Sequence, residues 1–226
     1  MSQRIFDLII SVSALVLLVP ILLPIIILLR FTGEGEIFFY QNRVGKYGKT
    51  FKLIKFATML KDSPNIGTGT VTVNEDPRIL PVGRFLRATK INEIPQLVNI
   101  LIGDMSIIGP RPQTERCFNA FPDHSQEQIK KVRPGLSGVG SIIFRSEEVM
   151  MTERSDPEQF YDEVIMPYKG LLEEWYVKNK SIGLYWKCII ITFIVVLKPD
   201  SDIAWRLFKY IPLPPEHLKV HISYYQ

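Results

Sequence analysis

Hydrophobic residues are concentrated in an N-terminal stretch of the chain, in which no charged residue occurs from Leu8 to Leu29. These 22 residues would form a helix about 33 Å long, enough to cross the hydrocarbon core of a bilayer. The stretch is long for the apolar part of a signal peptide, and no small-residue cleavage site follows it. The pattern therefore predicts that the chain associates with a phospholipid membrane.

Pro20 and Pro24 lie one turn apart in the second half of this stretch, and each removes a helical hydrogen bond. Two structures accommodate them: a kinked helix that spans the membrane, or a re-entrant hairpin that returns to the face it entered. Local chemistry alone favours the spanning helix, because prolines are common in such helices. The basic residues that follow, from Arg30 to Lys55, indicate that this end is cytoplasmic.

Two short strands are expected after the hydrophobic stretch, between glycine-containing turns. The patterns cover residues 36–40 and 50–56, and Gly45 and Gly48 mark a turn between them. They predict a small β-hairpin. The proline- and glycine-containing residues 61–78 that follow are typical of a polar loop.

Most of the remaining patterns predict helices. A short helix is expected near 82–89, and a better one over 93–102 that ends at Gly103. Asn92 has the side chain of a good N-cap for this second helix. Stiff proline turns predict loops at 103–112 and 133–138. Further helical patterns cover residues 113–121, 124–132 and 157–179.

A second apolar segment, from Cys188 to Leu197, is too short to span a bilayer. Aromatic and basic residues surround it, a composition that is typical of helices in the membrane interface. The alternative is a core helix with a basic, solvated face. We therefore predict a mainly helical α+β fold with three parts: a membrane segment over 1–31, a main domain over 32–200 and a tail over 201–226.

The composition narrows the class of protein without identifying an activity. The chain has 226 residues, 46% of them hydrophobic and 22% charged, with a formal net charge of +4. The charged fraction excludes a protein made of several membrane spans, and the hydrophobic fraction excludes a disordered chain. Two cysteines are too few for a disulfide scaffold. Basic residues are not interleaved with stacking aromatics outside the membrane-like region, so no nucleic-acid partner is expected.

The densest group of candidate functional residues lies around Glu93. Basic residues precede it, and the N-terminus of a helix itself favours anions. Arg111 and Arg133 stand beside prolines that restrict their backbones. Such a set suits phosphate groups and a divalent metal held by Glu93 and Asp104, although a solvated basic surface has the same composition.

Ordered motifs along residues 3–200 resemble those of the bacterial sugar transferases, the small monotopic polyprenyl-phosphate phosphoglycosyltransferases. The motifs are Arg4-Ile-Phe-Asp7, Phe38-Phe-Tyr-Gln-Asn-Arg-Val-Gly45, Lys55-Phe56, Asp76-Pro-Arg78, Gly83-Arg-Phe-Leu-Arg87, Glu93-Ile-Pro-Gln96, Gly103-Asp-Met-Ser106, Gly109-Pro-Arg-Pro112 and Arg133-Pro-Gly-Leu-Ser-Gly138.

The resemblance implies a re-entrant hairpin broken at Pro20, which places a monotopic protein on the cytoplasmic face of a bacterial inner membrane. Amphipathic interfacial helices would surround a cytoplasmic catalytic core. The implied reaction moves a sugar-1-phosphate from a UDP-sugar to undecaprenyl phosphate, with Mg²⁺ present and UMP released. This is the first membrane step in making a surface glycan: an exopolysaccharide, capsule, O-antigen or glycoprotein. The apolar surfaces also leave room for a homodimer.

The resemblance also implies roles for individual residues. Asn92 and Glu93 occupy the catalytic positions, and Glu93 would help to hold the metal. The uridine end of the substrate would lie near the loop that contains Arg111 and Pro112. The implied substrate- and phosphate-binding residues are Lys55, Arg78, Arg87, Gln96, Arg111, Pro112 and Arg133.

Asn92 departs from the family pattern, in which an aspartate attacks the β-phosphorus and forms a covalent phospho-sugar intermediate. An amide is a very poor nucleophile. If the chain is an active natural variant, either Glu93 attacks instead or the lipid phosphate attacks the UDP-sugar directly. If the chain is inactive, it is an engineered form, a catalytically silent membrane scaffold or a polyprenyl-phosphate-binding protein. Asn-Glu versions of the motif occur in the family, which favours the active variant.

Overall fold

The computed structural model describes residues 2–67, 72–73, 75–145, 147–152, 156–198, 201–219 and 222. Over these residues the chain is mainly helical, with a small antiparallel sheet of two strands, so the predicted α+β class with mostly helices is confirmed. Of the predicted loop 61–78, residues 68–71 and 74 lie outside the described residues, as do 199 and 200 at the predicted tail boundary.

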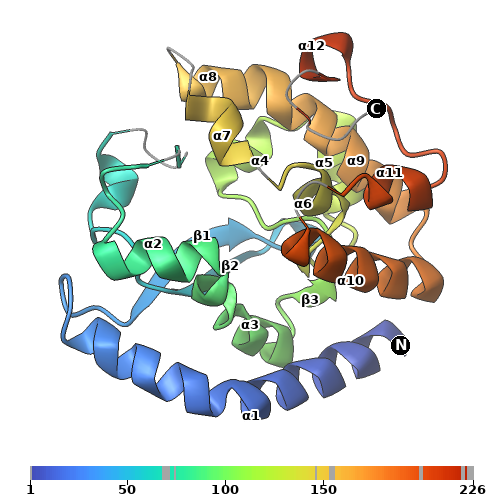
Figure 1. The fold of residues 1–226 in the computed structure, drawn as a ribbon. Coiled ribbons are helices and arrows are strands. Elements are labelled where there is room, and N and C mark those ends of the chain that lie inside the picture. Colours follow the sequence, from blue (N-terminus) through green and yellow to red (C-terminus); the bar gives the residue numbers. More distant parts are fainter. Residues whose placement is uncertain are drawn as a thin grey trace.

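The N-terminal hydrophobic stretch forms one continuous helix, α1 (Ser2–Arg30), which contains both Pro20 and Pro24. Figure 1 shows α1 bowed along the lower edge of the molecule, below α3 (Gln96–Ile102). In the part of the chain that the structure describes, α1 is the one helix long and apolar enough to cross a membrane. The predicted hairpin with a break at Pro20 is not confirmed by this continuous helix and stays a prediction.

Both ends of α1 are attached to the rest of the protein. Near its start, the buried carboxylate of Asp7 accepts hydrogen bonds from the hydroxyls of Ser106 (2.8 Å) and Tyr185 (3.0 Å). Near its end, Leu29 packs in a cluster with Phe56. The two ends of this long apolar helix therefore lie against the same globular body.

The predicted β-hairpin is confirmed as β1 (Phe38–Val44) and β2 (Thr50–Phe56). The second strand has its predicted bounds, whereas the first begins two residues later and ends four residues later than expected. Phe39 lies opposite Lys55 in the register of the pair. Exposure alternates along β1, so that Phe39, Gln41 and Arg43 are the less exposed residues. The side chains of these three residues therefore point toward the interior of the protein and not toward solvent.

Asn99 of α3 attaches that helix to β2. Its side-chain oxygen accepts from the backbone N–H of Ile54 (3.0 Å), and its amide nitrogen donates to the backbone carbonyl of Lys52 (2.8 Å). Asn99 is fully buried, and a buried amide with satisfied hydrogen bonds fixes the spacing of the segments it joins. This contact holds Lys55 close to the turn that precedes α3.

The segments 103–112 and 133–138 were expected to be loops, and that prediction is wrong for part of each. They contain β3 (Ser106–Ile108) and β4 (Gly135–Ser137), which pair in parallel. Glycines permit the close approach, because a Cβ on Gly135 would lie 2.1 Å from the backbone nitrogen of Gly109. The pairing fixes the loop that carries Arg111 just after β3.

Helices form the rest of the fold. The predicted helix near 82–89 is α2 (Pro81–Ala88), and the other predicted helices are also present with shifted ends. They are α4 (Glu115–Asn119), α5 (Asp123–Ile129), and the run of α8 (Pro157–Phe160), a π-helical turn (Tyr161–Ile165) and α9 (Met166–Lys178). The sequence patterns did not predict α6 (Val139–Ile143) or α7 (Glu147–Thr152).

The C-terminal segment packs against the main core. It contains α11 (Ile203–Leu207) and α12 (Glu216–Lys219), and the buried side chains of Phe208 and Leu218 belong to the large hydrophobic cluster. The hydroxyl of Tyr168 on α9 also donates to the carbonyl of Pro212 (2.8 Å). The segment predicted as a tail is therefore integrated into the fold.

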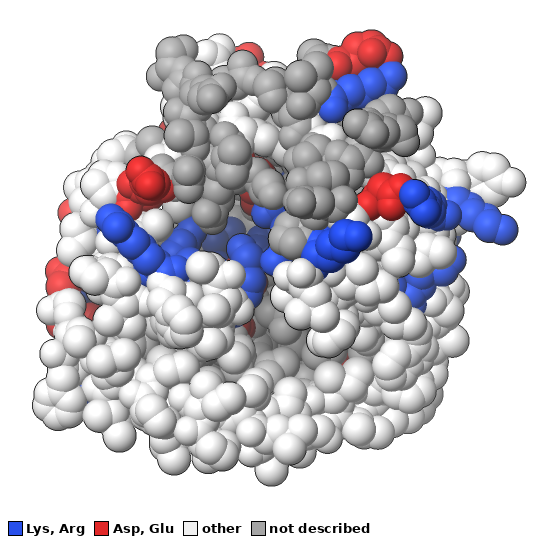
Figure 2. Space-filling view, viewed as in Figure 1, with Lys and Arg blue, Asp and Glu red and all other residues white. Residues whose placement is uncertain are grey.

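Large apolar side chains are exposed on three neighbouring helices, α1, α3 and α10 (Ile182–Leu197). On α10 they recur at helical spacing, so they occupy one face of the helix. Figure 2 shows that the lowest part of this view, where α1 lies, carries no Lys, Arg, Asp or Glu, whereas basic residues gather around a hollow above it. The exposed apolar residues include Ile9, Val16, Leu23, Ile27, Ile102, Ile190 and Phe193.

Candidate active site

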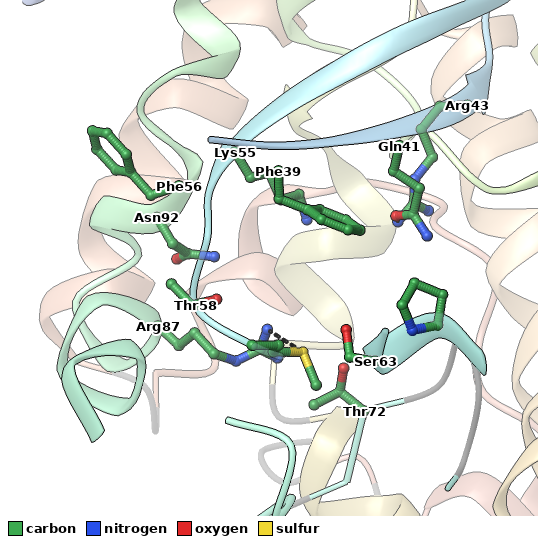
Figure 3. A pocket seen from close by; sticks show the side chains of 12 residues that line it. Phe39, Gln41, Arg43, Lys55, Phe56, Thr58, Ser63, Thr72, Arg87 and Asn92 are labelled. Carbon is green, nitrogen blue, oxygen red and sulfur yellow. Dashed lines mark hydrogen bonds between the residues drawn. The ribbon is translucent and has the colours of Figure 1, made fainter. Parts of the chain in front are cut away.

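A polar pocket opens beside the end of the β-hairpin where β1 begins and β2 ends. Three cationic side chains line it, and they come from three elements: Arg43 from β1, Lys55 from β2 and Arg87 from α2. Figure 3 shows Arg43 and Arg87 on opposite sides of the pocket. The other described lining residues are Phe39, Gln41, Phe56, Thr58, Met59, Ser63, Pro64, Thr72 and Asn92.

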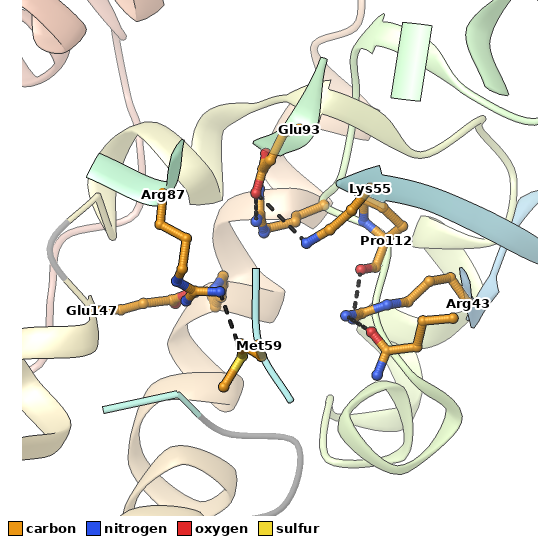
Figure 4. Close-up of polar contacts among 10 residues, drawn as sticks. Arg43, Lys55, Met59, Arg87, Glu93, Pro112 and Glu147 are labelled. Atoms are coloured by element: carbon orange, nitrogen blue, oxygen red, sulfur yellow. Dashed lines mark hydrogen bonds and ion pairs between the residues drawn. The ribbon is translucent and has the colours of Figure 1, made fainter. Parts of the chain in front are cut away.

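Glu93 lies next to this pocket, in a short 3₁₀ turn (Ile91–Glu93) before α3. Arg111 contacts both of its carboxylate oxygens, at 2.6 and 3.4 Å, and the Lys55 ammonium lies 3.6 Å from one of them (Figure 4). Burial opposes ionisation, but Arg111 and Lys55 outweigh it and hold the pKa of Glu93 well below its usual range. Glu93 is therefore a permanently ionised carboxylate at neutral pH.

Lys55 has an unusual charge state for a lysine. Burial lowers the pKa of its ammonium to about 7, with Arg111, Arg43 and Arg87 acting in the same direction and Glu93 in the opposite one. Lys55 consequently gains and loses its charge near neutral pH. An anion bound in the pocket would favour the charged form.

Arg43 is a further, partly buried cation, and the sequence motifs did not assign it to the site. It donates to the carbonyl of Pro112 (3.1 Å) and to the side-chain oxygen of Gln41 (2.5 Å), while its Nε has no partner among the described residues. Burial lowers the pKa of Arg43 to about 10. The alternation of Phe39, Gln41 and Arg43 along the predicted strand is the signal that could have identified it.

Asn92 lies in the same 3₁₀ turn as Glu93, but its side chain points into the pocket (Figure 3). It is 4% exposed, and its side-chain oxygen has no hydrogen-bond partner in the described part of the chain. The prediction that Asn92 caps the next helix is wrong. That helix begins only at Gln96, after Pro95, because the residues before it form a separate turn that starts from a left-handed Lys90 (φ 58°).

The structure brings together six of the predicted site residues and leaves others apart. Lys55, Arg87 and Asn92 line the pocket, Glu93 and Pro112 contact lining residues, and Arg111 contacts Glu93. Gln96 is buried at the first position of α3, close to Glu93 in sequence. Its amide nitrogen has no hydrogen-bond partner among the described atoms.

Two predicted phosphate-binding residues make other contacts. The Arg78 guanidinium is 4% exposed, pairs with Asp76 and donates to the backbone carbonyls of Ser63 (2.8 Å) and Ile66 (2.9 Å). Arg133 donates to the carbonyl of Gly103 (2.7 Å) at the end of α3. Neither residue lines the pocket, so any effect of Arg78 on binding would pass through the loop that it fastens.

Comparisons with known proteins now identify the family. Residues 1–199 match the sequence model described as "Bacterial sugar transferase". The chain belongs to the bacterial sugar transferase family. An exopolysaccharide production protein, ExoY, of Sinorhizobium fredii is 36% identical over 160 residues, which are 65% of this chain and 70% of that protein.

Other relatives of this sugar transferase have names that specify donor and acceptor. The UDP-glucose:undecaprenyl-phosphate glucose-1-phosphate transferase of Klebsiella pneumoniae is 34% identical over 192 residues, 84% of this chain and 39% of that protein. The UDP-N-acetylgalactosamine-undecaprenyl-phosphate N-acetylgalactosaminephosphotransferase of Aeromonas hydrophila is 35% identical over 145 residues, 62% of this chain and 34% of that protein. The chain spans well under half the length of both.

A second layer of charged residues supports Arg111 in this sugar transferase. Glu173 of α9 is 1% exposed, and its carboxylate accepts from the backbone N–H of Arg111 at 3.4 Å. Burial raises the pKa of Glu173 to about 7. One turn earlier, the buried Lys169 pairs with Glu147 of α7. The sequence signal that could have indicated these residues is the charged pair Lys169 and Glu173, which lie four positions apart within a predicted helix.

The Mg²⁺ that the resemblance implies has one suitable ligand beside the pocket, Glu93. In the described parts of the chain, no group of three or more His, Cys, Asp or Glu residues could hold a metal by itself. Asp104 lies beyond the other end of α3, so it does not share a site with Glu93. Magnesium commonly uses one or two carboxylates together with substrate phosphates and water. The ionised Glu93 fits that arrangement as a single protein ligand.

Proposed function

We propose that this protein transfers a sugar-1-phosphate from a UDP-sugar to undecaprenyl phosphate and releases UMP, as the first membrane step in the synthesis of an exopolysaccharide or related surface glycan. One observation carries the proposal: four cations, Arg43, Lys55, Arg87 and Arg111, gather around a pocket with one adjacent carboxylate, Glu93. This excess of positive charge matches a diphosphate donor and a phosphate acceptor. The substrates named for the relatives support the same assignment.

The residues of the site would act mainly by neutralising charge. Phosphoryl transfer requires positioning and stabilisation of charge more than covalent chemistry from the protein. The planar guanidinium of Arg111 would donate hydrogen bonds to Glu93 and to a phosphate oxygen. The Lys55 ammonium would contact both of these groups. Glu93 would be the protein ligand of Mg²⁺, and the metal, when bound, would neutralise the diphosphate.

The attachment of α1 supports a monotopic arrangement on the membrane. If α1 crossed a bilayer as a straight span, its two ends would lie about 40 Å apart on opposite faces. Asp7 and Leu29, near those ends, both contact the same globular body. We therefore favour a monotopic protein on the cytoplasmic face of the inner membrane, with α1 dipping in and α10 in the interface. The basic pocket would then face the lipid phosphate at the membrane surface.

The direct test is an assay of UMP release from UDP-glucose, UDP-galactose and UDP-N-acetylgalactosamine with undecaprenyl phosphate and Mg²⁺. We expect release from at least one donor, and a loss of about 10²-fold in kcat/KM for Glu93→Gln. Glu216→Gln, on the exposed α12, is the matched control and should leave the rate unchanged. If no donor releases UMP while undecaprenyl phosphate still binds, the protein is a lipid-phosphate-binding protein and not a transferase.

A further inference from the structure

The pocket beside Asn92 contains cations but no carboxylate among the described residues that line it. Arg43, Lys55 and Arg87 line it, whereas Glu93 does not. Figure 4 shows the Glu93 carboxylate directed at its basic partners, and Figure 3 shows the Asn92 amide directed into the pocket. The described residues that line the pocket therefore supply cations that can bind anions, and none of them is itself anionic.

With Lys55 kept in its charged form by a bound phosphate, the described residues offer no effective nucleophile in this pocket. The amide of Asn92 is a very poor nucleophile. Both oxygens of Glu93 are engaged by Arg111, at 2.6 and 3.4 Å, and one also faces Lys55 at 3.6 Å. A carboxylate held by these two cations is a weak nucleophile, because attack on phosphorus would require it to give up these contacts. The hydroxyls of Thr58, Ser63 and Thr72 have no carboxylate or histidine beside them in the described lining to accept a proton.

We propose, on the basis of the function proposed above, that the pocket holds the donor diphosphate and the acceptor phosphate at the same time, and that the acceptor attacks directly. An oxygen of the lipid phosphate forms a bond to the β-phosphorus of the UDP-sugar. The bond from this phosphorus to the oxygen that bridges to the α-phosphorus breaks, and its electron pair leaves with UMP. No proton has to move when the attacking phosphate is dianionic, and no protein residue is modified.

The placement of the cations supports two neighbouring phosphate sites. Arg43 and Arg87 reach the pocket from opposite sides, with Lys55 between them (Figure 3). Direct attack requires two anions to meet, and cations on both sides offset their repulsion. Asn92 suits this task because its amide donates a hydrogen bond to a phosphate oxygen without adding a negative charge. In this arrangement Asn92 is a substrate-binding residue, and Arg43 is a second phosphate ligand.

Isotope exchange separates the direct route from a covalent one. The full chain, in lipid nanodiscs with Mg²⁺ and each of the three UDP-sugars, is incubated with labelled UMP in the absence of undecaprenyl phosphate. The direct route predicts no label in the UDP-sugar and no added phospho-sugar mass on the protein, although UMP is released once the acceptor is added. Exchange without acceptor, or a phospho-sugar on Glu93, would overturn this inference while leaving the proposed function intact. Absence of UMP release with acceptor would overturn both.

Substitution of Asn92 provides a second, independent readout. Asn92→Asp places a carboxylate where the acceptor phosphate is to bind, so KM for undecaprenyl phosphate should rise roughly tenfold through repulsion. Asn119→Asp adds the same charge on an exposed residue of α4 and is the control. An unchanged or lower KM for the acceptor in Asn92→Asp would contradict the assignment of Asn92 as a ligand of that phosphate.

Discussion

Arg111 contacts both carboxylate oxygens of Glu93, with the nearer pair of atoms 2.6 Å apart. The two residues come from different local structures: a turn before α3 and the loop after β3. A planar guanidinium matches a carboxylate in this way, whereas an ammonium is a point charge that makes one short contact. The orientation of the Glu93 carboxylate therefore depends on arginine in particular.

Arg111→Lys should consequently lower kcat/KM for the UDP-sugar by about 10²-fold, although the charge is kept. The measurement is the initial rate of UMP release over a range of donor concentrations. Arg206→Lys on α11 changes an exposed arginine that pairs with Asp202 and should have no effect. Equal rates for the two variants would show that charge alone suffices at position 111.

Lys55 should impose a pH limit on the free enzyme. Its pKa of about 7 means that the ammonium is lost as pH rises through neutrality, so phosphate binding weakens. We expect kcat/KM to fall above about pH 7, and kcat to fall less because bound phosphates favour the charged form. Lys55→Arg stays charged and should abolish this fall, whereas the exposed Lys209→Arg should retain it. The same alkaline fall in Lys55→Arg would exclude Lys55 as its cause.

The hydrogen bond from Tyr185 to Asp7 should contribute measurably to stability. Tyr185→Phe removes one donor to a buried carboxylate, which costs about 1.5 kcal/mol and lowers Tm by about 5 °C. Thermal unfolding of the purified chain in nanodiscs measures this. Tyr40→Phe, at a position that is 56% exposed, is the control with the same chemical change. A Tm shift no larger than that of the control would mean that Asp7 is satisfied without Tyr185.

The topology of α1 can be tested with single cysteines at its two ends. Ser2→Cys and Glu34→Cys introduce thiols at exposed positions, and the native Cys117 and Cys188 are buried. A hairpin predicts that a membrane-impermeant maleimide labels neither variant in intact cells and both after permeabilisation. A spanning helix predicts labelling of one end in intact cells. Labelling of Ser2→Cys from the periplasm would therefore rule out the monotopic arrangement.

Local signals in the sequence were enough for the elements that local chemistry specifies. The β-hairpin follows from alternation and glycine turns, and α3 ends at Gly103 in the left-handed conformation that the residue type indicated (φ 102°). The cations around Glu93 were also recognised from their motifs. Arg43 was overlooked although its strand alternation was visible, because its role depends on distant partners: the carbonyl of Pro112 and the pocket that it shares with Arg87.

Non-local contacts account for most of what the sequence did not predict. The strands β3 and β4 have three residues each and pair across 29 positions between Ser106 and Gly135, so neither has a signal of its own. Asn92 obeys the local rule for a cap, yet it lies inside a separate 3₁₀ turn, and Ile94 and Pro95 stand between that turn and the start of α3. The contact of Glu173 with the backbone of Arg111 joins residues 62 positions apart. No pattern within α9 specifies that partner.

The partners of Asp7 have a consequence for biosynthesis. Its carboxylate belongs to α1, but its partners Ser106 and Tyr185 lie 99 and 178 residues further along the chain. A carboxylate is costly in hydrocarbon without such partners, so the start of α1 has to stay near water while the rest of the chain is synthesised. The final docking of α1 thus waits until β3 and α10 have been synthesised. A chain truncated before α10 would lack Tyr185, so the start of α1 would not be held in its final position.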